Sequence, residues 1–445
     1  MKNLSLWVMT LALLILGSCK SDNSGIEDLL KTVPSSAAAV VGIDLQEIIK
    51  DAGCSLKNNE IVPGKDMEQL IAKMSSTGKK DLMLLFNGNT GIAPEAAVIF
   101  YDAGRLFLTF NLYDSAKFKS FSESQSGEKF YEENGIQLLN NKIALKGDQV
   151  WVCLSDNRRI DPDGIANYAS LSESRSFLST DMAKIILEKE DDIVGWGDFS
   201  ALVSNLSNRS SSTMVSLAAG LLFEDVEAVS FSWDFNKGEA DFELKFLNSK
   251  GKPAKYLLPA DKININTVKK LGGSCDVLAA LTLSPKTFEK FEKLGSAFGG
   301  QLFGNMKDAF KNIDGTIAVA MSENPDDING IITTTGPVSS DVKSLLTQQG
   351  RNISEDGKFI LFSKGTPSGA LSVDAQASLL KDYCMGAVLQ PQMITRSAEV
   401  NSQVASNFSW LTIGFQPDDG GIELKVELKA VDTNQNILIT FLKSL

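Results

Sequence analysis

Residues 231–246 read Phe-Ser-Trp-Asp-Phe-Asn-Lys-Gly-Glu-Ala-Asp-Phe-Glu-Leu-Lys-Phe, and they indicate the fold class. Large apolar side chains alternate with polar ones before the Asn236–Gly238 turn, and again after it. Alternation with period two predicts strands that have one packed and one solvated face. A short turn containing Gly joins two such strands into an antiparallel hairpin, so an all-parallel sheet is excluded.

The same hairpin pattern recurs along the chain. Residues 411–426 repeat it closely, with Glu423-Leu-Lys425 standing where the first hairpin has Glu243-Leu-Lys245. We predict Phe235 and Phe415 at equivalent core positions. Two further hairpins are predicted from alternation, and they join Ala96–Tyr101 to Leu106–Leu112 and Thr316–Met321 to Asn329–Thr334.

Each hairpin follows a short strand and a helix. In 41–51 and 371–382 an apolar strand ends at an Asp that we expect to cap the next helix, Asp44 and Asp374 respectively. Glu47 stands three residues after Asp44, as in a capping box. Related segments place caps at Asp198 and Ser284, and second helices are predicted at 216–223 and 288–310.

These elements predict an α+β fold made of strand–helix–helix–hairpin units that start near residues 40, 193, 277 and 370. The best linker is Asn248–Pro253, because it combines small, charged and helix-breaking residues. We therefore expect two related halves of antiparallel sheet, 34–250 and 256–445, with helices packed on one face of each sheet.

The first 18 residues form a signal peptide, with Lys2 before the apolar run 4–16. Its end, Leu16-Gly-Ser-Cys19, resembles the lipobox of bacterial lipoproteins. This resemblance implies cleavage before Cys19 and acylation of Cys19 with fatty acids such as palmitate, and two or three acyl chains give stable membrane anchoring. We interpret 19–33 as the lipidated Cys and a flexible tether.

Composition excludes several classes of function. The chain has no His, 43 Lys plus Arg and 55 Asp plus Glu, for a net charge of −12. Without His there is no Ser-His-Asp triad and no His-ligated metal site, so we expect no cofactor and no bound metal. The acidic balance argues against a nucleic-acid partner.

The cysteines of the mature chain besides Cys19 allow three disulfide pairings, but their spacing favours buried free thiols: Cys54, Cys153, Cys275 and Cys384.

Two weak motifs could indicate hydrolytic chemistry. Ser340-x-x-Lys343 and Ser155-Asp156-Asn157 occur in penicillin-binding enzymes, but here their order is reversed and the Lys-Thr-Gly strand is missing. A helix start and a chance triplet explain them better, so no catalytic residue is assigned. The tryptophans could be sugar platforms, although strand positions favour the core: Trp151, Trp196, Trp233 and Trp410.

Acidic residues gather at two places. A calcium loop is suggested by Asp156, Asp161, Asp163 and Gly164, but Ser172 stands where an EF-hand needs Glu. A turn containing Pro162 is the better interpretation. A second group consists of Glu188, Glu190, Asp191 and Asp192. These carboxylates could hold a divalent cation weakly, but we favour a solvated edge before a strand.

Asp114-Ser115-Ala116 resembles the acceptor motif for O-glycosylation in Bacteroidota, which implies a glycan on Ser115. Asp114 as a helix cap is the alternative, and we favour it because Asp is a preferred N-cap residue.

The lipobox, the opening Val33-Pro-Ser-Ser-Ala37 and the duplicated units together resemble a cell-envelope lipoprotein family of Bacteroidota known as a domain of unknown function. That resemblance implies an envelope location, on the outer membrane, with either the periplasmic or the surface face. Two hypotheses follow. The first is a non-enzymatic binding or scaffold module for a protein or glycan partner, with the membrane contacted through Cys19. The alternative is a His-free hydrolase that uses carboxylates or a Ser-Lys pair on envelope or glycan substrates.

Overall fold

The structure is a computed structural model, and it describes residues 24–57, 59–73, 90–155, 158–204, 219–220, 222–289, 310–393 and 405–444. The described residues fall into two compact units. Unit 1 consists of the described residues up to Leu202, within Ser230–Ala240 and from Thr433 onward. Unit 2 takes those in Val203–Val229 and Asp241–Asp432. These units differ from the predicted halves at their edges, because 203–229 joins unit 2 and the C-terminal segment joins unit 1.

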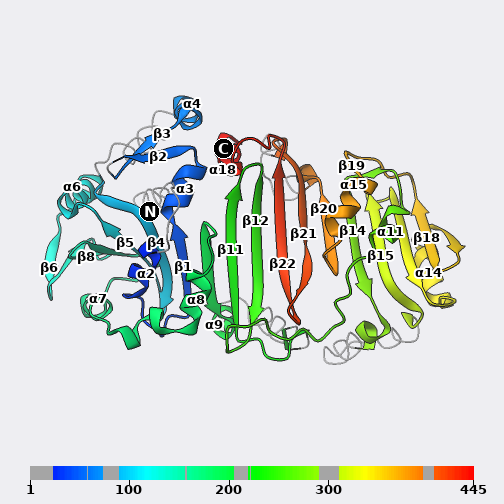
Figure 1. The fold of residues 1–445 in the computed structure, drawn as a ribbon, viewed down its shortest axis with the longest axis horizontal. Coiled ribbons are helices and arrows are strands. Elements are labelled where there is room, and N and C mark those ends of the chain that lie inside the picture. The colour runs from blue at the N-terminus through cyan, green and yellow to red at the C-terminus, as the bar shows by residue number, and fades with distance from the viewer. Residues whose placement is uncertain are drawn as a thin grey trace. The chain divides into compact units, whose positions relative to one another are not determined.

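Unit 1 is built on an antiparallel sheet, as the alternating hydrophobic pattern predicts (Figure 1). Hydrogen-bonded pairing gives the order β10-β1-β4-β5-β9-β8-β7-β6. Its strands are β1 Ala39–Asp44, β4 Ile92–Asp102, β5 Arg105–Leu112, β6 Tyr131–Glu133, β7 Ile136–Leu139, β8 Ile143–Lys146, β9 Gln149–Cys153 and β10 Ile193–Asp198. The unit also contains the small hairpin β2 Cys54–Lys57 with β3 Glu60–Pro63, and β11 Ala228–Asn236 from Ser230 on.

The helices of unit 1 are short. They are α2 Ser24–Leu30, α3 Leu45–Asp51, α4 Lys65–Lys73, α6 Ser115–Ser126, α7 Pro162–Tyr168, α8 Asp181–Leu187, α9 Phe199–Ser204 and α18 Ile437–Ser444, with 3₁₀ turns η1 Glu173–Arg175 and η2 Phe177–Ser179. The cap predicted at Asp44 is confirmed, because its side chain accepts a hydrogen bond from Glu47 N at 2.9 Å. The Asp44 N–H donates to the carbonyl of Asp192 at 2.9 Å, so only half of the capping box forms.

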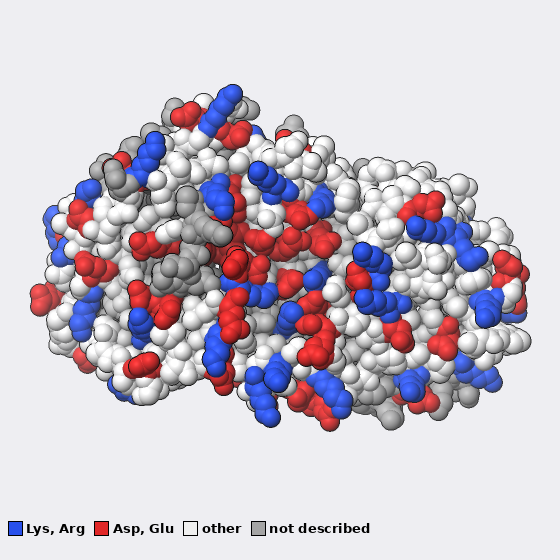
Figure 2. Space-filling view, in the orientation of Figure 1, with Lys and Arg blue, Asp and Glu red and all other residues white. Residues whose placement is uncertain are grey.

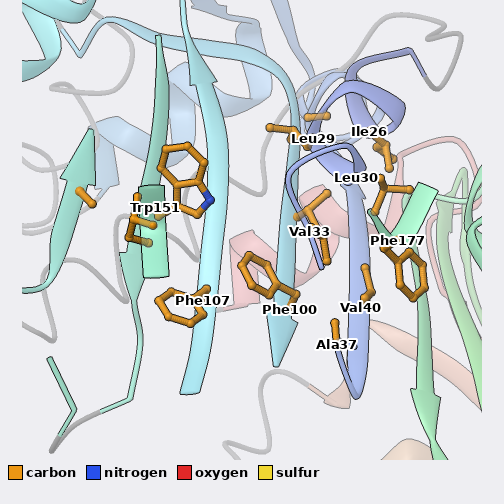
Figure 3. Packing of buried hydrophobic residues seen from close by; sticks show 14 of the residues in the cluster. Ile26, Leu29, Leu30, Val33, Ala37, Val40, Phe100, Phe107, Trp151 and Phe177 are labelled. Carbon is orange, nitrogen blue, oxygen red and sulfur yellow. The ribbon is translucent and has the colours of Figure 1, made fainter. Parts of the chain in front are cut away.

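The core of unit 1 lies between this sheet and α2, α7 and α8. Trp151, Phe107 and Phe100 stand on β9, β5 and β4, and Leu30 and Val33 come from the N-terminal segment (Figure 3). All five residues are at most 1% exposed, and the rings of Phe100 and Phe107 stack with centroids 5.2 Å apart.

The tether predicted over 19–33 is wrong from Ser24 on. Ile26, Leu29 and Leu30 recur at helical spacing on one face of α2, and all three are buried against the sheet (Figure 3). Residues 20–25 are polar, but the apolar stripe that follows them has the periodicity of an amphipathic helix. The chain therefore joins the packed core soon after the candidate acylation site.

Unit 2 is a second antiparallel sheet, in the order β22-β21-β20-β14-β15-β16-β18-β17, and β12 pairs with β22 (Figure 1). Its strands are β12 Glu239–Leu247 from Asp241 on, β14 Val277–Leu283, β15 Ile313–Met321, β16 Ile328–Thr334, β17 Asn352–Asp356, β18 Phe359–Lys364, β20 Met385–Leu389, β21 Phe408–Asp418 and β22 Gly421–Ala430. A separate two-stranded sheet consists of β13 Ser274–Cys275 and β19 Leu371–Ser372. Its helices are α11 Ile265–Lys269, α14 Ser340–Gln348 and α15 Val373–Ala377, followed by the turn η4 Ser378–Leu380.

One face of the unit 2 sheet is covered by α11, α15 and η4. Leu278 and Val388 are fully buried there against Val373 and Leu380. Gly414 and Gly386 allow this close packing, because an added Cβ on Gly414 would lie 2.6 Å from the ring of Tyr383. The opposite face of the unit 2 sheet is also covered in part, because Val342 and Leu346 of α14 are buried there against Ile332 and Ile360. The mixed α and β class agrees with the prediction, but the expectation of helices on one face only is wrong for unit 2.

Asp374 does not cap its helix, so that prediction is wrong. The N-cap of α15 is Ser372, and Asp374 lies in the first turn. The caps predicted at Asp198 and Asp114 are confirmed, because they accept hydrogen bonds from Ala201 N at 2.7 Å and Lys117 N at 3.0 Å. Of the predicted second helices, half of 216–223 and most of 288–310 lie outside the described residues.

Candidate functional site

The residues to which the lipobox points, 16–19, lie outside the described residues, as does the signal peptide. Acylation of Cys19 therefore stays a prediction. Among the residues that the structure describes, no helix is both long and apolar enough to cross a bilayer.

Ser115 is the first residue of α6 and is half-buried. Its neighbour Asp114 is occupied as the N-cap of that helix, which is the alternative that the sequence favoured. Glycosylation of Ser115 is not tested by this geometry and stays a prediction.

The Ser340–Lys343 pair does not form a catalytic dyad in this structure. Lys343 is paired with Glu355 across the helix–strand contact between α14 and β17, and the N-cap of α14 is Ser339. Ser155 belongs to unit 1, where its hydroxyl accepts a hydrogen bond from Leu106 N at 2.9 Å. Asp156 and Asn157 lie outside the described residues.

The suggested calcium loop is a helix start. Asp161 is the N-cap residue of α7 and Pro162 its first residue, as the sequence interpretation favoured. Asp163 accepts a hydrogen bond from Asn134 at 2.8 Å. In the described part of the chain, no group of three or more Cys, Asp or Glu side chains is arranged to hold a metal ion.

The four described cysteines are buried and free, as the sequence favoured. Burial raises the pKa of the thiols of Cys54, Cys275 and Cys384 to about 11. Thiols with raised pKa values are poor nucleophiles at neutral pH, so these residues fill space in the core and do not supply chemistry.

The tryptophans divide between core and surface. Trp151 is fully buried, and Trp196 and Trp410 are half-buried against the cores of their units. The core position predicted for Trp233 is wrong, because it is 40% exposed. On β11 the neighbour Ser232 takes the buried position, where its hydroxyl accepts a hydrogen bond from Lys189 at 2.7 Å.

The most distinctive surface of unit 2 is an apolar area on β20, β21 and β22, on the sheet face opposite α11 and α15. On the same face, α14 covers β16 and β18. Directly paired residues of antiparallel strands lie on the same face of a sheet. The pairing of β20, β21 and β22 therefore builds three apolar rows, which are Met385–Phe415–Leu424, Ala387–Ile413–Val426 and Leu389–Leu411–Leu428. We call these nine residues the three-row face.

None of the nine side chains of the three-row face is fully buried, and Met385 and Ile413 are 44% and 38% exposed. On the same strands the neighbours that point the other way, Val388 and Thr412, are fully buried. The sequence predicts Phe235 and Phe415 at equivalent core positions, with Ile413 on the same face as Phe415 by alternation. Phe235 is buried, whereas Phe415 is half-buried at the edge of the cluster that contains Phe223 and Ile422. Ile413 is not in the core, and Thr412 takes the fully buried side, where η4 packs closely against small residues.

The other side of β22 carries charges. Lys245 on β12 lies 2.8 Å from Asp418 and 2.9 Å from Glu423, and Lys425 lies 3.0 Å from Glu243 and 3.3 Å from Glu423. We call these five residues the charge network, and Figure 2 shows acidic and basic side chains interspersed over β12 and β22. Although burial alone lowers the pKa of Lys245 and Lys425, their hydrogen bonds to carboxylates raise it overall.

Unit 1 contains a group of carboxyls that the sequence interpretation missed. Asp192, assigned to a solvated edge, is 1% exposed, and Asp51 and Asp234 lie beside it. Of the four residues in that acidic run, only Asp192 directly precedes the strand, and this position is the one local hint of its burial. The three carboxyls come from positions far apart in the sequence, so spacing carries no signal for them.

Comparisons with known proteins add little to this geometry. No family model matches the chain, and no curated protein matches it. Among solved structures, crystal form III of TP0453 aligns with a TM-score of 0.29 at 9% identity, covering 79% of this chain and 97% of that one. Crystal form I of TP0453 aligns with a TM-score of 0.26 at 10% identity, covering 79% and 96%. Such low scores do not establish a shared fold.

Proposed function

We propose that this chain is a non-enzymatic envelope lipoprotein that binds or scaffolds a protein partner through the three-row face. The observation that carries the proposal is that face itself. Nine apolar side chains in three adjacent rows remain half-buried or exposed, whereas monomeric proteins seldom leave apolar residues contiguous at the surface.

The chemistry of the face favours a protein over a glycan. Eight of its nine residues are aliphatic or Met, and only Phe415 is aromatic. Sugars stack on exposed aromatic rings flanked by hydrogen-bonding groups, whereas aliphatic and Met-rich surfaces suit protein contacts.

The hydrolase alternative has less support. Lys343 is paired with Glu355, and the carboxyl group of Asp192 is too deeply buried for a substrate to reach it. Glycoside hydrolysis needs two carboxyls on either side of a bound sugar.

A photo-crosslinker at position 413 tests the binding face in intact cells. We expect a covalent adduct whose added mass is identified as a peptide of another protein. The same crosslinker at Leu345, an apolar residue of α14 that is 50% exposed in the same unit, is the matched control and should give none. Equal adducts at both positions, or none at 413, would contradict a partner on the three-row face, and an adduct of sugar would favour a glycan.

We also propose that Cys19 is acylated and holds the protein at the outer membrane. The lipobox and the signal peptide support this. Cys19→Ala should abolish incorporation of labelled palmitate and release the chain from the membrane fraction. Cys54→Ala is the control, because Cys54 is a buried thiol of unit 1 and its loss should leave labelling unchanged.

Finally, we propose that the two halves arose by duplication. The order of the strands in the two sheets supports this. In unit 1 the order is β10-β1-β4-β5-β9-β8, and in unit 2 it is β20-β14-β15-β16-β18-β17. Strands at the same place in the two orders also come in the same succession along the chain. This matching pairs β1 with β14, so the counterpart of Asp44 is Ser284 and not Asp374. An experimental structure in which superposed halves separate Asp44 from Ser284 would contradict the duplication.

A further inference from the structure

Three carboxyl groups of unit 1 meet where three segments come together. Asp51 is the last residue of α3, Asp192 directly precedes β10, and Asp234 lies on β11. The side chains of Asp51 and Asp234 both lie within hydrogen-bonding reach of Asp192. We call these three residues the carboxyl cluster.

Asp192 is the centre of the cluster and is 1% exposed. Its Oδ2 accepts a hydrogen bond from Phe235 N at 2.6 Å, but among the described residues no N–H or O–H donor reaches its buried Oδ1. A buried carboxylate oxygen without a donor is costly, because water no longer solvates it. A proton held between Oδ1 and a neighbouring carboxyl would satisfy both oxygens.

The surroundings do not neutralise the cluster. From α3, Glu47 adds negative charge, and Lys50 adds positive charge but is itself paired with Glu47. Beside β10, Asp191 adds negative charge to Asp234 and is paired with Lys189 at 3.4 Å.

Burial and like charge act in the same direction on the cluster. Burial first, and then the Asp51 carboxylate, raise the pKa of Asp192. Burial and Glu47 raise the pKa of Asp51, and burial and Asp191 raise that of Asp234.

The cluster also joins β11 to its neighbours. The Phe235 N–H is held by Asp192, and the Phe235 carbonyl accepts a hydrogen bond from Asn436 at 2.6 Å. Asn436 precedes α18, whose Ile437 is fully buried. Whatever weakens the contact at Asp192 therefore loosens the attachment of β11 and of the C-terminal helix within unit 1.

We propose that Asp51, Asp192 and Asp234 share protons between their carboxyl groups, and that these protons fasten β11 to the α3–β10 edge of unit 1. Loss of the protons as the pH rises leaves like charges in contact and loosens β11. The attachment of β11 to the α3–β10 edge therefore depends on pH.

The direction of the pH dependence follows from linkage. Folded pKa values above the ordinary value of 3.8 mean that the folded state binds protons that the unfolded state has released. Between the ordinary pKa of these carboxyls and their folded pKa values, the free energy of unfolding is therefore highest at the low-pH end. It falls as the pH rises toward the folded pKa values. Each retained proton changes the folded-to-unfolded ratio about tenfold per pH unit.

Hydrogen exchange of β11 peptides in the full chain, corrected for the intrinsic exchange rate at each pH, tests the proposal. Between pH 6 and 8 the opening equilibrium should rise about tenfold per unit in the natural protein. Asp192→Asn should flatten this dependence and increase protection at pH 8. An Asn there still accepts from Phe235 N, and its amide group donates to the neighbouring carboxyls. Asp181→Asn on α8 removes an exposed carboxylate of the same unit and should leave the slope unchanged.

Two results would overturn the proposal. One is an Asp192→Asn variant that keeps the natural slope. The other is protection at pH 8 that rises with millimolar Ca²⁺ in the natural protein and not in the variant, since the cluster would then hold a cation. Should the variant fail to fold, proton release measured on urea unfolding of the natural protein at pH 7 decides: release supports shared protons, and its absence rejects them.

Discussion

Two buried carboxyls, one in each unit, lie in opposite environments. Asp192 in unit 1 is 1% exposed and faces other carboxyls, whereas Glu423 in unit 2 is 4% exposed and lies between Lys245 and Lys425. Burial alone therefore does not decide the charge of a carboxyl. The neighbouring groups decide the charge. Glu423 stabilises unit 2 as the partner of two lysines, whereas Asp192 stabilises unit 1 by sharing a proton with other carboxyls.

The difference follows from the elements that carry the partners. Glu423 lies on a long strand beside another, where lysine side chains from β12 and β22 reach it along the sheet. Asp192 lies at the start of a strand, next to the last residue of α3. The C-terminal end of a helix carries partial negative charge, which further disfavours a carboxylate there.

The largest expected effect is the contrast in pH dependence. From pH 6 to 8, unit 1 should lose about 1.4 kcal/mol per pH unit for each shared proton, whereas unit 2 should stay constant. The raised pKa values of Lys245 and Lys425 give stability that is present below 10.5 and lost only as the pH rises through the folded values. Thiol labelling of the buried Cys153 and Cys275, normalised to the unfolded rates, reports each unit separately.

Equal pH slopes of labelling at Cys153 and Cys275 would contradict this contrast between the two units. They would mean that the two units open together or that neither holds extra protons. A slope at Cys275 alone would reverse the assignment of the two carboxyl environments.

Glu423→Gln should cost unit 2 about 2 kcal/mol, because hydrogen bonds to buried charged groups contribute more than neutral ones. Each lysine would keep a single partner, Asp418 or Glu243. Urea unfolding measures the loss. Glu355→Gln, which breaks an ion pair whose Glu is 53% exposed, is the control and should change little. A loss equal to that of the control would show that the charge network adds no stability.

The sequence predicts the local part of this fold and misses the part made by distant segments. The β4–β5 and β15–β16 hairpins are confirmed because alternation and a short turn lie within one stretch of chain. The free thiols and the Asp44 cap are confirmed for similar local reasons.

What the sequence misses depends on tertiary contacts. The carboxyl cluster joins residues 51, 192 and 234, and no spacing rule relates them. The three-row face needs the register of three strands, and the polar Thr412 takes the buried side because η4 packs close to glycines there. Asp374 resembles Asp44 in sequence, but the N-cap position of its helix is Ser372, whose side chain makes no capping hydrogen bond.

The pair Asp44 and Asp374 gives a test with a smaller expected change in stability. Asp44→Ala should cost about 1 kcal/mol, because it removes the side chain that accepts from Glu47 N. Asp374→Ala should change stability by less than about 0.5 kcal/mol, since an exposed residue in the first turn gains only from the helix dipole. Urea unfolding of both variants measures the difference. Equal losses would restore the equivalence that the sequence suggested.

The smallest effect is expected at an ion pair with the same geometry as one in the charge network. Lys443 on α18 lies 2.8 Å from Asp66, as Lys245 does from Asp418. Lys443 and Asp66 are 34% and 45% exposed, so water and salt screen their attraction. Lys443→Met should therefore cost about 0.3 kcal/mol at low salt.

Urea unfolding at low and high salt measures this change. In 1 M salt it should vanish, whereas the cost of Glu423→Gln should largely persist because the side chain of Glu423 is only 5% exposed. If Lys443→Met cost as much as Glu423→Gln, distance alone would set the strength of these pairs. The contrast between the two buried carboxyls would then need another explanation than their partners.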